Sequence, residues 1–406
     1  MVRTEIQMQP KIEVVGGRVV SLDIFRGLTM LVMIFVNDLA DVHGLPWWNY
    51  HMPPHVNGMT YVDVVFPSFL FILGMAIPLA VRKRLEAGDS MLRLWSHILI
   101  RTFSLVVLGL VLANASKVDP KLTGLQPGLW ATLALVGAIL LWVVYPKTDG
   151  RQLLYRILKY AGLILLVAML AVFRRTARDG HTAWLDFRYW EILGLIARAY
   201  LAACILYIPL RRKPWAPMAL LVGLTALNVI SRLGWVSFLR HIPYVIWPFD
   251  AGELPSIVMA GIVASTIFLD SSLARSFKEK ALWALGYAAI LLGAGWIFLP
   301  FGVSKNAATP SWCLFCSGIS VLLFLALYWL ADVRRITGWA AILKPAGSNT
   351  LLTYLLPDLF YFACGAALAP FLWNSGLPGL ARSVLFTFAI LGVAGVLTKL
   401  RVRMQL

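Results

Sequence analysis

The sequence predicts an all-α integral membrane protein that crosses the bilayer many times. Of its 406 residues, 60% are hydrophobic and only 14% are charged, whereas a soluble domain carries about 25% charged residues. Apolar runs of about 20 residues, the length that a helix needs to cross the hydrocarbon core, recur along the whole chain. Lys and Arg gather in the short segments between these runs, as they do in cytoplasmic loops. The net charge of +17 therefore indicates membrane topology and not a nucleic-acid partner.

The apolar runs predict about 12 transmembrane helices, within a range of about 10 to 12, in one bundle. They are expected near residues 20–39, 62–81, 95–114, 127–145, 155–173, 190–210, 215–231, 254–270, 281–300, 311–331, 348–368 and 380–399. We interpret residues 20–400 as a single membrane domain, between a cytoplasmic N-terminal segment, 1–19, and a cytoplasmic tail, 401–406. The N-terminal segment lacks the apolar core and the cleavage site of a removable signal peptide.

The loops predict which side of the membrane each end of the chain occupies. Basic clusters occur in alternate loops, at 82–93, 147–156, 211–213, 275–280, 334–344 and 399–403. Because cytoplasmic loops collect Lys and Arg, these clusters place both termini in the cytoplasm. The segment 38–60 contains no Lys or Arg, so we expect it outside, with the loops at 115–126, 174–189, 232–253, 301–310 and 369–379. Arg174, Arg175 and Arg178 lie in one of these outer loops and run against the rule.

The first outer loop is the strongest candidate for a functional site. It reads WWNYHMPPHVNGMTYVD at 47–63 and contains His51 and His55. Histidine exchanges protons near neutral pH, so it suits acid–base chemistry. Asn37 and Asp63 lie at the membrane ends of the flanking apolar runs, where an unpaired polar group is costly and a partner or ligand is expected. A histidine with a carboxylate to fix its tautomer and an amide to bind an oxyanion is arranged for general base catalysis.

A metal site is the less favoured interpretation of the same loop. Asp41, His43, His51 and His55 are suitable ligand types, but no two of them stand at i,i+4 spacing on an expected helix. We therefore expect no metal. Cys313 and Cys316 have no second cysteine pair and lie in an apolar run, which indicates helix packing.

Four further polar groups stand out, three of them on the predicted cytoplasmic side. Arg26 follows Asp23 by one helical turn in the first run, so the two form an ion pair that either fixes packing or serves function. Arg101 either snorkels or binds an anion such as a phosphate. Asn349 lies at the start of a run that includes Tyr354, Pro357 and Asp358, which suggests a broken helix lining a cavity.

The fourth polar group comprises Lys305, Ser311 and Trp312, in and just after an outer loop on the same side as His51. Together these features fit two classes of protein. One is an enzyme that acts across the membrane, and the other is a carrier.

Two stretches of the chain resemble a known family. SLDIFRGLTMLVMIFVN at 21–37 and NGMTYVDVVFPSFLFILGMAIPL at 57–79 are similar to the heparan-alpha-glucosaminide N-acetyltransferase family of transmembrane acyltransferases. SKNAATPSW at 304–312 and AGSNTLLTYL at 346–355 extend the resemblance, while 115–255 matches less and has Gly194 and Leu195 where the family has Gln-Arg. The bacterial branch, labelled DUF5009 and N-acetylglucosamine-related transporter, is the most similar.

The resemblance implies transfer of an acetyl group from cytosolic acetyl-CoA to the amine of glucosamine or an amino-sugar saccharide at the outer face. It implies a catalytic histidine, for which we favour His51 over His55, acting as a base or as an acetyl carrier. Transport of N-acetylglucosamine or related amino sugars is the alternative function. We also expect a multi-pass protein of the bacterial inner (cytoplasmic) membrane and, by analogy, a homodimer. The remaining site residues that we assign are Asn37 and Asp63 for catalysis, Asn57, Lys305, Ser311 and Trp312 for the acceptor, and Arg26, Arg101 and Asn349 for CoA.

Overall fold

The computed structural model describes residues 19–146, 150–242, 247–269, 276–368 and 373–404. Most of the N-terminal segment and the last two residues of the tail lie outside this range. The regular secondary structure of the described part is helical apart from one small hairpin of β1 (Arg175–Thr176) and β2 (Thr182–Ala183). The predicted all-α fold class is therefore confirmed.

Each predicted run overlaps one long helix. These helices are α1 (Val20–Leu39), α2 (Val62–Glu86), α3 (Met91–Asn114), α5 (Pro127–Trp142), α6 (Gln152–Val172), α7 (Glu191–Leu210), α8 (Ala216–Arg232), α9 (Glu253–Leu269), α10 (Phe277–Ile297), α11 (Pro310–Tyr328), α13 (Thr350–Leu368) and α14 (Gly376–Lys399). Short helices connect them: η2 (Trp47–Asn49), η3 (Ala115–Lys117), α4 (Pro120–Thr123), η4 (Ser237–His241), η5 (Leu299–Phe301), η6 (Trp329–Val333), η7 (Gly338–Leu343) and α12 (Lys344–Ser348).

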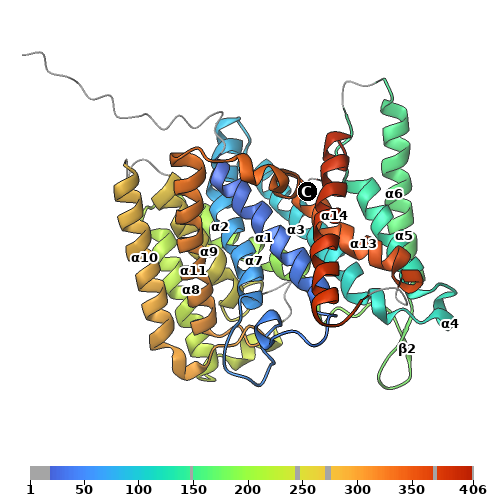
Figure 1. The fold of residues 1–406 in the computed structure, drawn as a ribbon, viewed down its shortest axis with the longest axis horizontal. Coiled ribbons are helices and arrows are strands. Elements are labelled where there is room, and N and C mark those ends of the chain that lie inside the picture. The colour runs from blue at the N-terminus through green and yellow to red at the C-terminus, as the bar shows by residue number, and fades with distance from the viewer. Residues whose placement is uncertain (1–18, 147–149, 243–246, 270–275, 369–372, 405–406) are drawn as a thin grey trace, which may run out of the picture.

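Among the described helices, 8 are long and apolar enough to cross a membrane: α1, α2, α3, α6, α7, α10, α11 and α14. The helices α5, α8 and α9 and the segment Thr350–Gly365 of α13 are apolar but shorter. The chain is therefore a multi-pass membrane protein, and the count of about 12 crossings stays a prediction. α1 begins and α14 ends at the same end of the bundle, while the loop after α1 lies at the opposite end (Figure 1).

Helix ends differ from the apolar runs by up to about one and a half turns, and capping explains two of these differences. α10 begins at Phe277, ahead of the run at 281–300, because Ser276 and Glu279 form a capping box that satisfies two backbone N–H groups. α3 begins at Met91, where the Ser90 side chain accepts a hydrogen bond from the Arg93 N–H at 3.3 Å. Hydropathy predicts the part of a helix that lies in lipid, whereas the capping residues determine at which residue the helix begins.

The core lies where α1, α2, α9 and α11 pack together. Phe71 of α2 and Phe268 of α9 are buried, and Phe324 of α11 contacts both Phe268 and Phe25 of α1. By contrast, α6 at the edge of the bundle exposes Leu153, Ile164 and other apolar side chains. An apolar helix face without a protein partner is what a lipid-facing helix presents.

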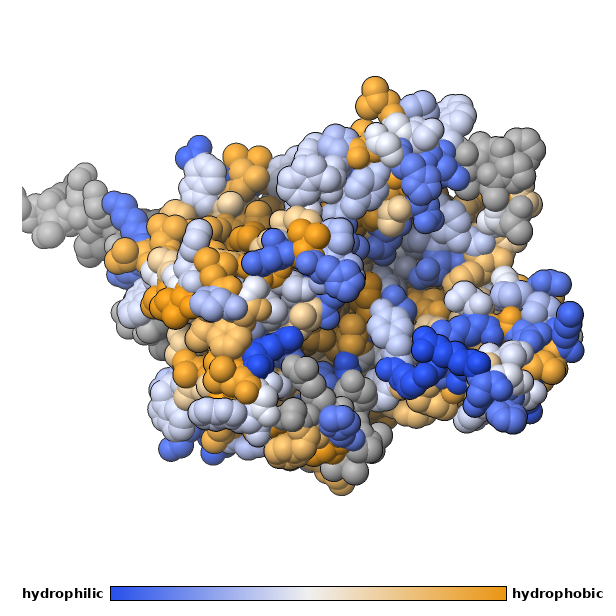
Figure 2. All heavy atoms as spheres, turned by 90° about the horizontal axis from the view of Figure 1, so that it is seen from below, coloured by the Kyte–Doolittle hydropathy of each residue, from blue (hydrophilic) through white to orange (hydrophobic). Residues whose placement is uncertain are grey.

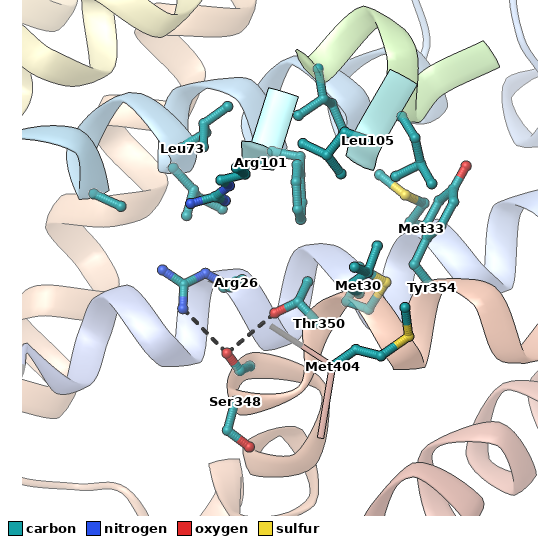
Figure 3. Close-up of a pocket in the computed structure, with 17 residues that line it drawn as sticks. Arg26, Met30, Met33, Leu73, Arg101, Leu105, Ser348, Thr350, Tyr354 and Met404 are labelled. Carbon is teal, nitrogen blue, oxygen red and sulfur yellow. Dashed lines mark hydrogen bonds between the residues drawn. The ribbon is translucent and has the colours of Figure 1, made fainter. Parts of the chain in front are cut away.

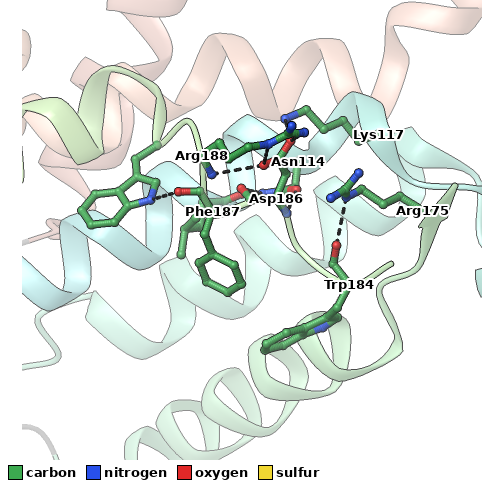
Figure 4. Close-up of polar contacts among 9 residues, drawn as sticks. Asn114, Lys117, Arg175, Trp184, Asp186, Phe187 and Arg188 are labelled. Carbon is green, nitrogen blue, oxygen red and sulfur yellow. Dashed lines mark hydrogen bonds and ion pairs between the residues drawn. The ribbon is translucent and has the colours of Figure 1, made fainter. Parts of the chain in front are cut away.

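Two of the basic residues that ran against the topology rule, Arg174 and Arg175, donate hydrogen bonds to backbone carbonyls. Arg174 Nη1 donates to the carbonyls of Ala171 and Phe173 at the end of α6, where cations are favourable. Nearby, Asp186 accepts hydrogen bonds from Arg188 and Lys117 (Figure 4), and the Arg188 guanidinium holds the pKa of this carboxyl well below its usual range. Seen from the loop end, hydrophilic side chains gather over α4 and the hairpin (Figure 2).

Candidate active site

His51 contacts a buried carboxylate at the start of α2. Its Nδ1 lies 2.7 Å from Asp63 Oδ1, and the Asp63 side chain is 1% exposed. Asp63 Oδ2 accepts hydrogen bonds from the backbone N–H of Thr60 at 3.0 Å and of Met52 at 3.2 Å. The carboxylate is thus fixed by two segments of the loop. In the tautomer that donates the Nδ1 proton to this carboxylate, Nε2 of His51 is the nitrogen with a lone pair.

Lys305 reaches the same imidazole from a distant loop. Its Nζ lies 2.9 Å from His51 Nε2 and 3.2 Å from Nδ1. The two similar distances place the amine beside the ring rather than in line with a single nitrogen. Burial lowers the pKa of the Lys305 amine, and the negative charges of Asp63 and Glu191 oppose this shift. His51 therefore lies between a carboxylate and a cation.

Asn57 joins the two loops that carry this arrangement. Its Oδ1 accepts a hydrogen bond from the Val303 N–H at 2.6 Å, and the Gly58 N–H donates to the Val303 carbonyl at 2.9 Å. Ser304 N–H then donates to Thr309 Oγ1 at 3.1 Å, which closes the second loop on itself. Asn57, which we assigned to the acceptor, therefore aligns the loop that carries Lys305.

Asn37 and His55 lie apart from these contacts. Both side chains are exposed, and neither forms a hydrogen bond or ion pair with the described residues. The neighbour of Asn37, Asp38, is instead buried and accepts from Arg382 Nη2 at 3.1 Å and from the Tyr361 hydroxyl. At the end of α1, the polar group that needed a partner is therefore Asp38, which ties α1 to α13 and α14.

Ser311 and Trp312 lie in the first turn of α11 and are 0% and 1% exposed. Within the described residues, Ser311 Oγ and Trp312 Nε1 have no hydrogen-bond partner. Both side chains are therefore part of the helix core and do not line an open surface.

A cavity of about 370 Å³ lies between the helices on the side where α1 begins. Arg26 of α1 and Arg101 of α3 approach it from opposite sides (Figure 3). Arg26 Nη1 donates to the Gly347 carbonyl at 3.2 Å and lies 3.3 Å from Asp23 Oδ1. The remaining lining is largely apolar: Met30, Met33, Phe69, Ile72, Leu73, Ala76, Leu105, Leu193, Ile196, Gly347, Ser348, Thr350, Leu351, Tyr354 and Met404.

The two arginines differ in their surroundings. A Cβ on Gly347 would lie 2.4 Å from the Asp23 carbonyl oxygen, so only glycine lets α12 approach α1 and reach Arg26. The Arg101 guanidinium stacks on the Tyr200 ring at 4.9 Å and forms no ion pair with a carboxylate in the described part of the chain. Arg101 is therefore available to an anion.

Asn349 is not among the residues that line the cavity. Its Nδ2 donates to Thr398 Oγ1 and to the Val402 carbonyl, and its Oδ1 accepts from the Met404 N–H. These bonds hold the start of α13 against the segment that follows α14. Its neighbours Ser348 and Thr350 line the cavity instead.

Glu191, which sequence reasoning did not single out, connects the cavity wall with the histidine site. Tyr354 lines the cavity, and its hydroxyl donates to Glu191 Oε2 at 3.2 Å. Glu191 in turn interacts electrostatically with Lys305. The signal that could have identified it is the one used for Asp63, an acidic residue at the start of an apolar run.

Comparison with known proteins supplies a family for this arrangement. The profile of a domain of unknown function (DUF5009) matches residues 18–240, which is more than half of the chain. The chain belongs to the DUF5009 family. The matched segment contains α1 to α8, and with them His51, Asp63 and Glu191, but not Lys305.

Members of another named group are similar to part of this DUF5009 protein. Heparan-alpha-glucosaminide N-acetyltransferase of Mus musculus is 38% identical over 99 residues, and that of Homo sapiens is 38% identical over 97 residues. Each match covers 24% of this chain and 14% of the relative.

In the described residues, no group of three or more His, Cys, Asp and Glu side chains is arranged to hold a metal ion.

Proposed function

We propose that this protein is a transmembrane acetyltransferase that moves an acetyl group from cytosolic acetyl-CoA to the amine of glucosamine or an amino-sugar saccharide at the outer face. The similarity to two N-acetyltransferases supports the reaction class. The observation that carries the proposal is the contact between His51 Nδ1 and the buried Asp63 carboxylate at 2.7 Å. A histidine oriented in this way can use its other nitrogen, Nε2, in proton or acetyl transfer.

In the first route, His51 Nε2 takes a proton from the amine. The amine nitrogen bonds to the thioester carbonyl carbon, the C–S bond breaks, and CoA leaves as a thiolate that takes up a proton. In the second route, Nε2 attacks the thioester carbon, the C–S bond breaks and CoA leaves as a thiolate that takes up a proton. The amine then attacks the acyl-imidazole, loses a proton and displaces His51. The Lys305 cation, beside the ring, stabilises the oxyanion of the carbonyl in either route. Asn37 is proposed to polarise the acetyl carbonyl or to orient the imidazole ring, and His55 is the second candidate for the catalytic histidine.

The side chains that line the cavity are of the types that would bind acetyl-CoA. The two guanidinium groups of Arg26 and Arg101 match the phosphates of CoA, and the methionine and leucine side chains match its flexible, largely apolar arm. Ser348 and Thr350 are proposed as polar contacts in the place that we had assigned to Asn349. We propose the bacterial inner membrane as the location, and a homodimer as the assembly.

A carrier of N-acetylglucosamine or related amino sugars is the second candidate function. The polar groups Tyr354, Glu191 and Lys305, which connect the cavity with the outer site, favour it, because polar side chains at bilayer depth often mark a substrate path.

One experiment separates the two functions. Purified protein is incubated with labelled acetyl-CoA and glucosamine, and proteoliposomes are tested for uptake of labelled N-acetylglucosamine in the absence of CoA. The acetyltransferase proposal expects acetylated product and no uptake. Uptake without CoA, together with no acetyl transfer to any amino sugar, would identify a carrier.

A further inference from the structure

Glu191 occupies a place that packing defines closely. It is the first residue of α7, and its φ of 56° lies in the left-handed region. A residue other than glycine adopts this backbone conformation only where its surroundings require it. Those surroundings include α3, since a Cβ on Gly109 would lie 2.2 Å from the carbonyl oxygen of Trp190. The close approach of α3 fixes the start of α7 and, with it, the position of the Glu191 carboxylate.

The Glu191 carboxylate accepts two hydrogen bonds but has no cation bound to it. Its Oε2 accepts from the Ile192 N–H and from the Tyr354 hydroxyl. Within the described part of the chain it forms no ion pair, and Lys305, which interacts with it electrostatically, is in contact with His51. A carboxylate at the end of a membrane helix is expected to have a cationic partner. Among the residues that the structure describes, no Lys, Arg or His side chain forms an ion pair with Glu191.

We propose that Glu191 binds the ammonium group of the acceptor, so that the substrate class is a primary amine that is protonated in water. The inference rests on the proposed function, because it makes Glu191 the residue of the proposed active site that binds the acceptor. Tyr354 is a positioning residue in this proposal, since its hydroxyl orients the carboxylate from the wall of the cavity. An amine bound to Glu191 lies on the path between the cavity and His51, where an acetyl group from the cavity must meet it.

The proton balance follows from this placement. The bound ammonium loses one proton to His51 and becomes a nucleophile, and the new amide loses a second proton when the C–S bond breaks. One of these protons ends on the CoA thiolate and the other is released. Glu191 takes no part in these proton transfers and binds the charged acceptor before the reaction.

The test measures binding and turnover separately. Equilibrium binding of glucosamine, of N-acetylglucosamine and of acetyl-CoA is measured by calorimetry on the wild type and on Glu191→Gln, Glu191→Asp and Glu253→Gln. Glu253→Gln is the matched control, because Glu253 is likewise the first residue of an apolar helix and accepts a backbone hydrogen bond. Loss of a charged hydrogen bond should weaken glucosamine binding by roughly 10- to 100-fold in Glu191→Gln. Glu191→Asp should keep part of the affinity.

Three controls make the result specific. Acetyl-CoA affinity should stay within about twofold in every variant, which also shows that each is folded, and the Glu253→Gln protein should bind glucosamine like the wild type. In turnover, Glu191→Gln should raise the KM for glucosamine and leave the KM for acetyl-CoA unchanged. N-acetylglucosamine, which has the same ring without the charge, should bind all variants equally.

The outcomes distinguish the two proposals. If Glu191→Gln binds glucosamine as tightly as the wild type, or if the wild type binds none, the assignment of Glu191 is wrong, whether or not acetyl transfer occurs. An equal loss of affinity for glucosamine and for acetyl-CoA also overturns it. If the wild type binds glucosamine through Glu191 but transfers no acetyl group, the assignment stands and the acetyltransferase function is wrong.

Discussion

His51 and His55 lie on one loop but differ in what they contact. In the described structure, His51 has Asp63 on one side and Lys305 on the other, while His55 is exposed and bonds to neither. We predict that His51→Ala lowers the rate of acetyl transfer by about 100-fold or more, because it removes the base or acetyl carrier. His55→Ala is the matched control and should stay within about twofold of wild type. Labelled acetyl transfer measures both, and the reverse ranking would exchange the two assignments.

The lowered pKa of Lys305 predicts how the rate of acetyl transfer depends on pH. Burial favours the neutral amine, so Lys305 loses its proton, and its positive charge beside His51, at a pH below the ordinary value of 10.5 for lysine. The rate of transfer should therefore fall on the alkaline side before pH 10.5. In Lys305→Arg, whose side chain keeps its charge at all these pH values, this alkaline decrease should disappear from the pH–rate profile. An unchanged profile would show that the Lys305 charge is not used.

Arg101 gives a prediction for the donor. It lines the cavity and forms no ion pair in the described residues, so a phosphate of CoA is its proposed partner. We expect Arg101→Met to raise the KM for acetyl-CoA roughly tenfold or more and to leave the KM for the acceptor unchanged. Arg93→Met, on the same helix but exposed and paired with Asp89, is the control. Equal effects of the two substitutions would argue against CoA in this cavity.

At the scale of elements, the contact between two loops decides whether the site forms. Asn57 accepts from the Val303 N–H, and this contact aligns the segment that brings Lys305 to His51. Asn57→Ala should lower kcat by roughly 10- to 100-fold, because misplacement of a reacting group by about 1 Å has effects of this size. Asn57→Asp keeps the acceptor oxygen and should restore most of the rate, and Val56→Ala, on an exposed side chain of the same loop, should have no effect.

The elements themselves were largely predictable. The run at 20–39 coincides with α1, and each of the other runs overlaps one helix, because apolar length is a property of the local sequence. The residues at which the helices end were less predictable. α5 ends at Trp142 and not at 145, because Val144 N–H donates to the Arg403 carbonyl and pairs with the segment after α14. No local sequence pattern predicts a contact with a segment so distant along the chain.

For the whole molecule, the arrangement predicts reaction across the membrane. The cavity with its arginines opens near the start of α1, and His51 lies beyond the end of that helix, which at 1.5 Å per residue is about 30 Å long. In proteoliposomes with glucosamine trapped inside, acetyl-CoA added outside should give acetylated product inside. Empty liposomes and the His51→Ala protein are the controls. Product that forms only when both substrates are on the same side would contradict the proposed direction of transfer.

The sequence by itself determined the fold class, the position of each long helix, and the loop that carries His51 and Asp63. Hydropathy, basic clusters and polar residues at the ends of apolar runs are all local, so they can be read without a fold. They also allowed Arg26 and Arg101 to be proposed for an anion before the cavity between them was known.

Only the tertiary structure decided which polar side chains meet. Consecutive helix residues point about 100° apart, so packing alone determined that Asp38 is buried while Asn37 is exposed. In the same way, Lys305 reaches His51 across 254 positions of the chain, and Tyr354 of α13 reaches Glu191 of α7. These contacts depend on the packing of several helices against one another, and no stretch of the sequence contains that information by itself.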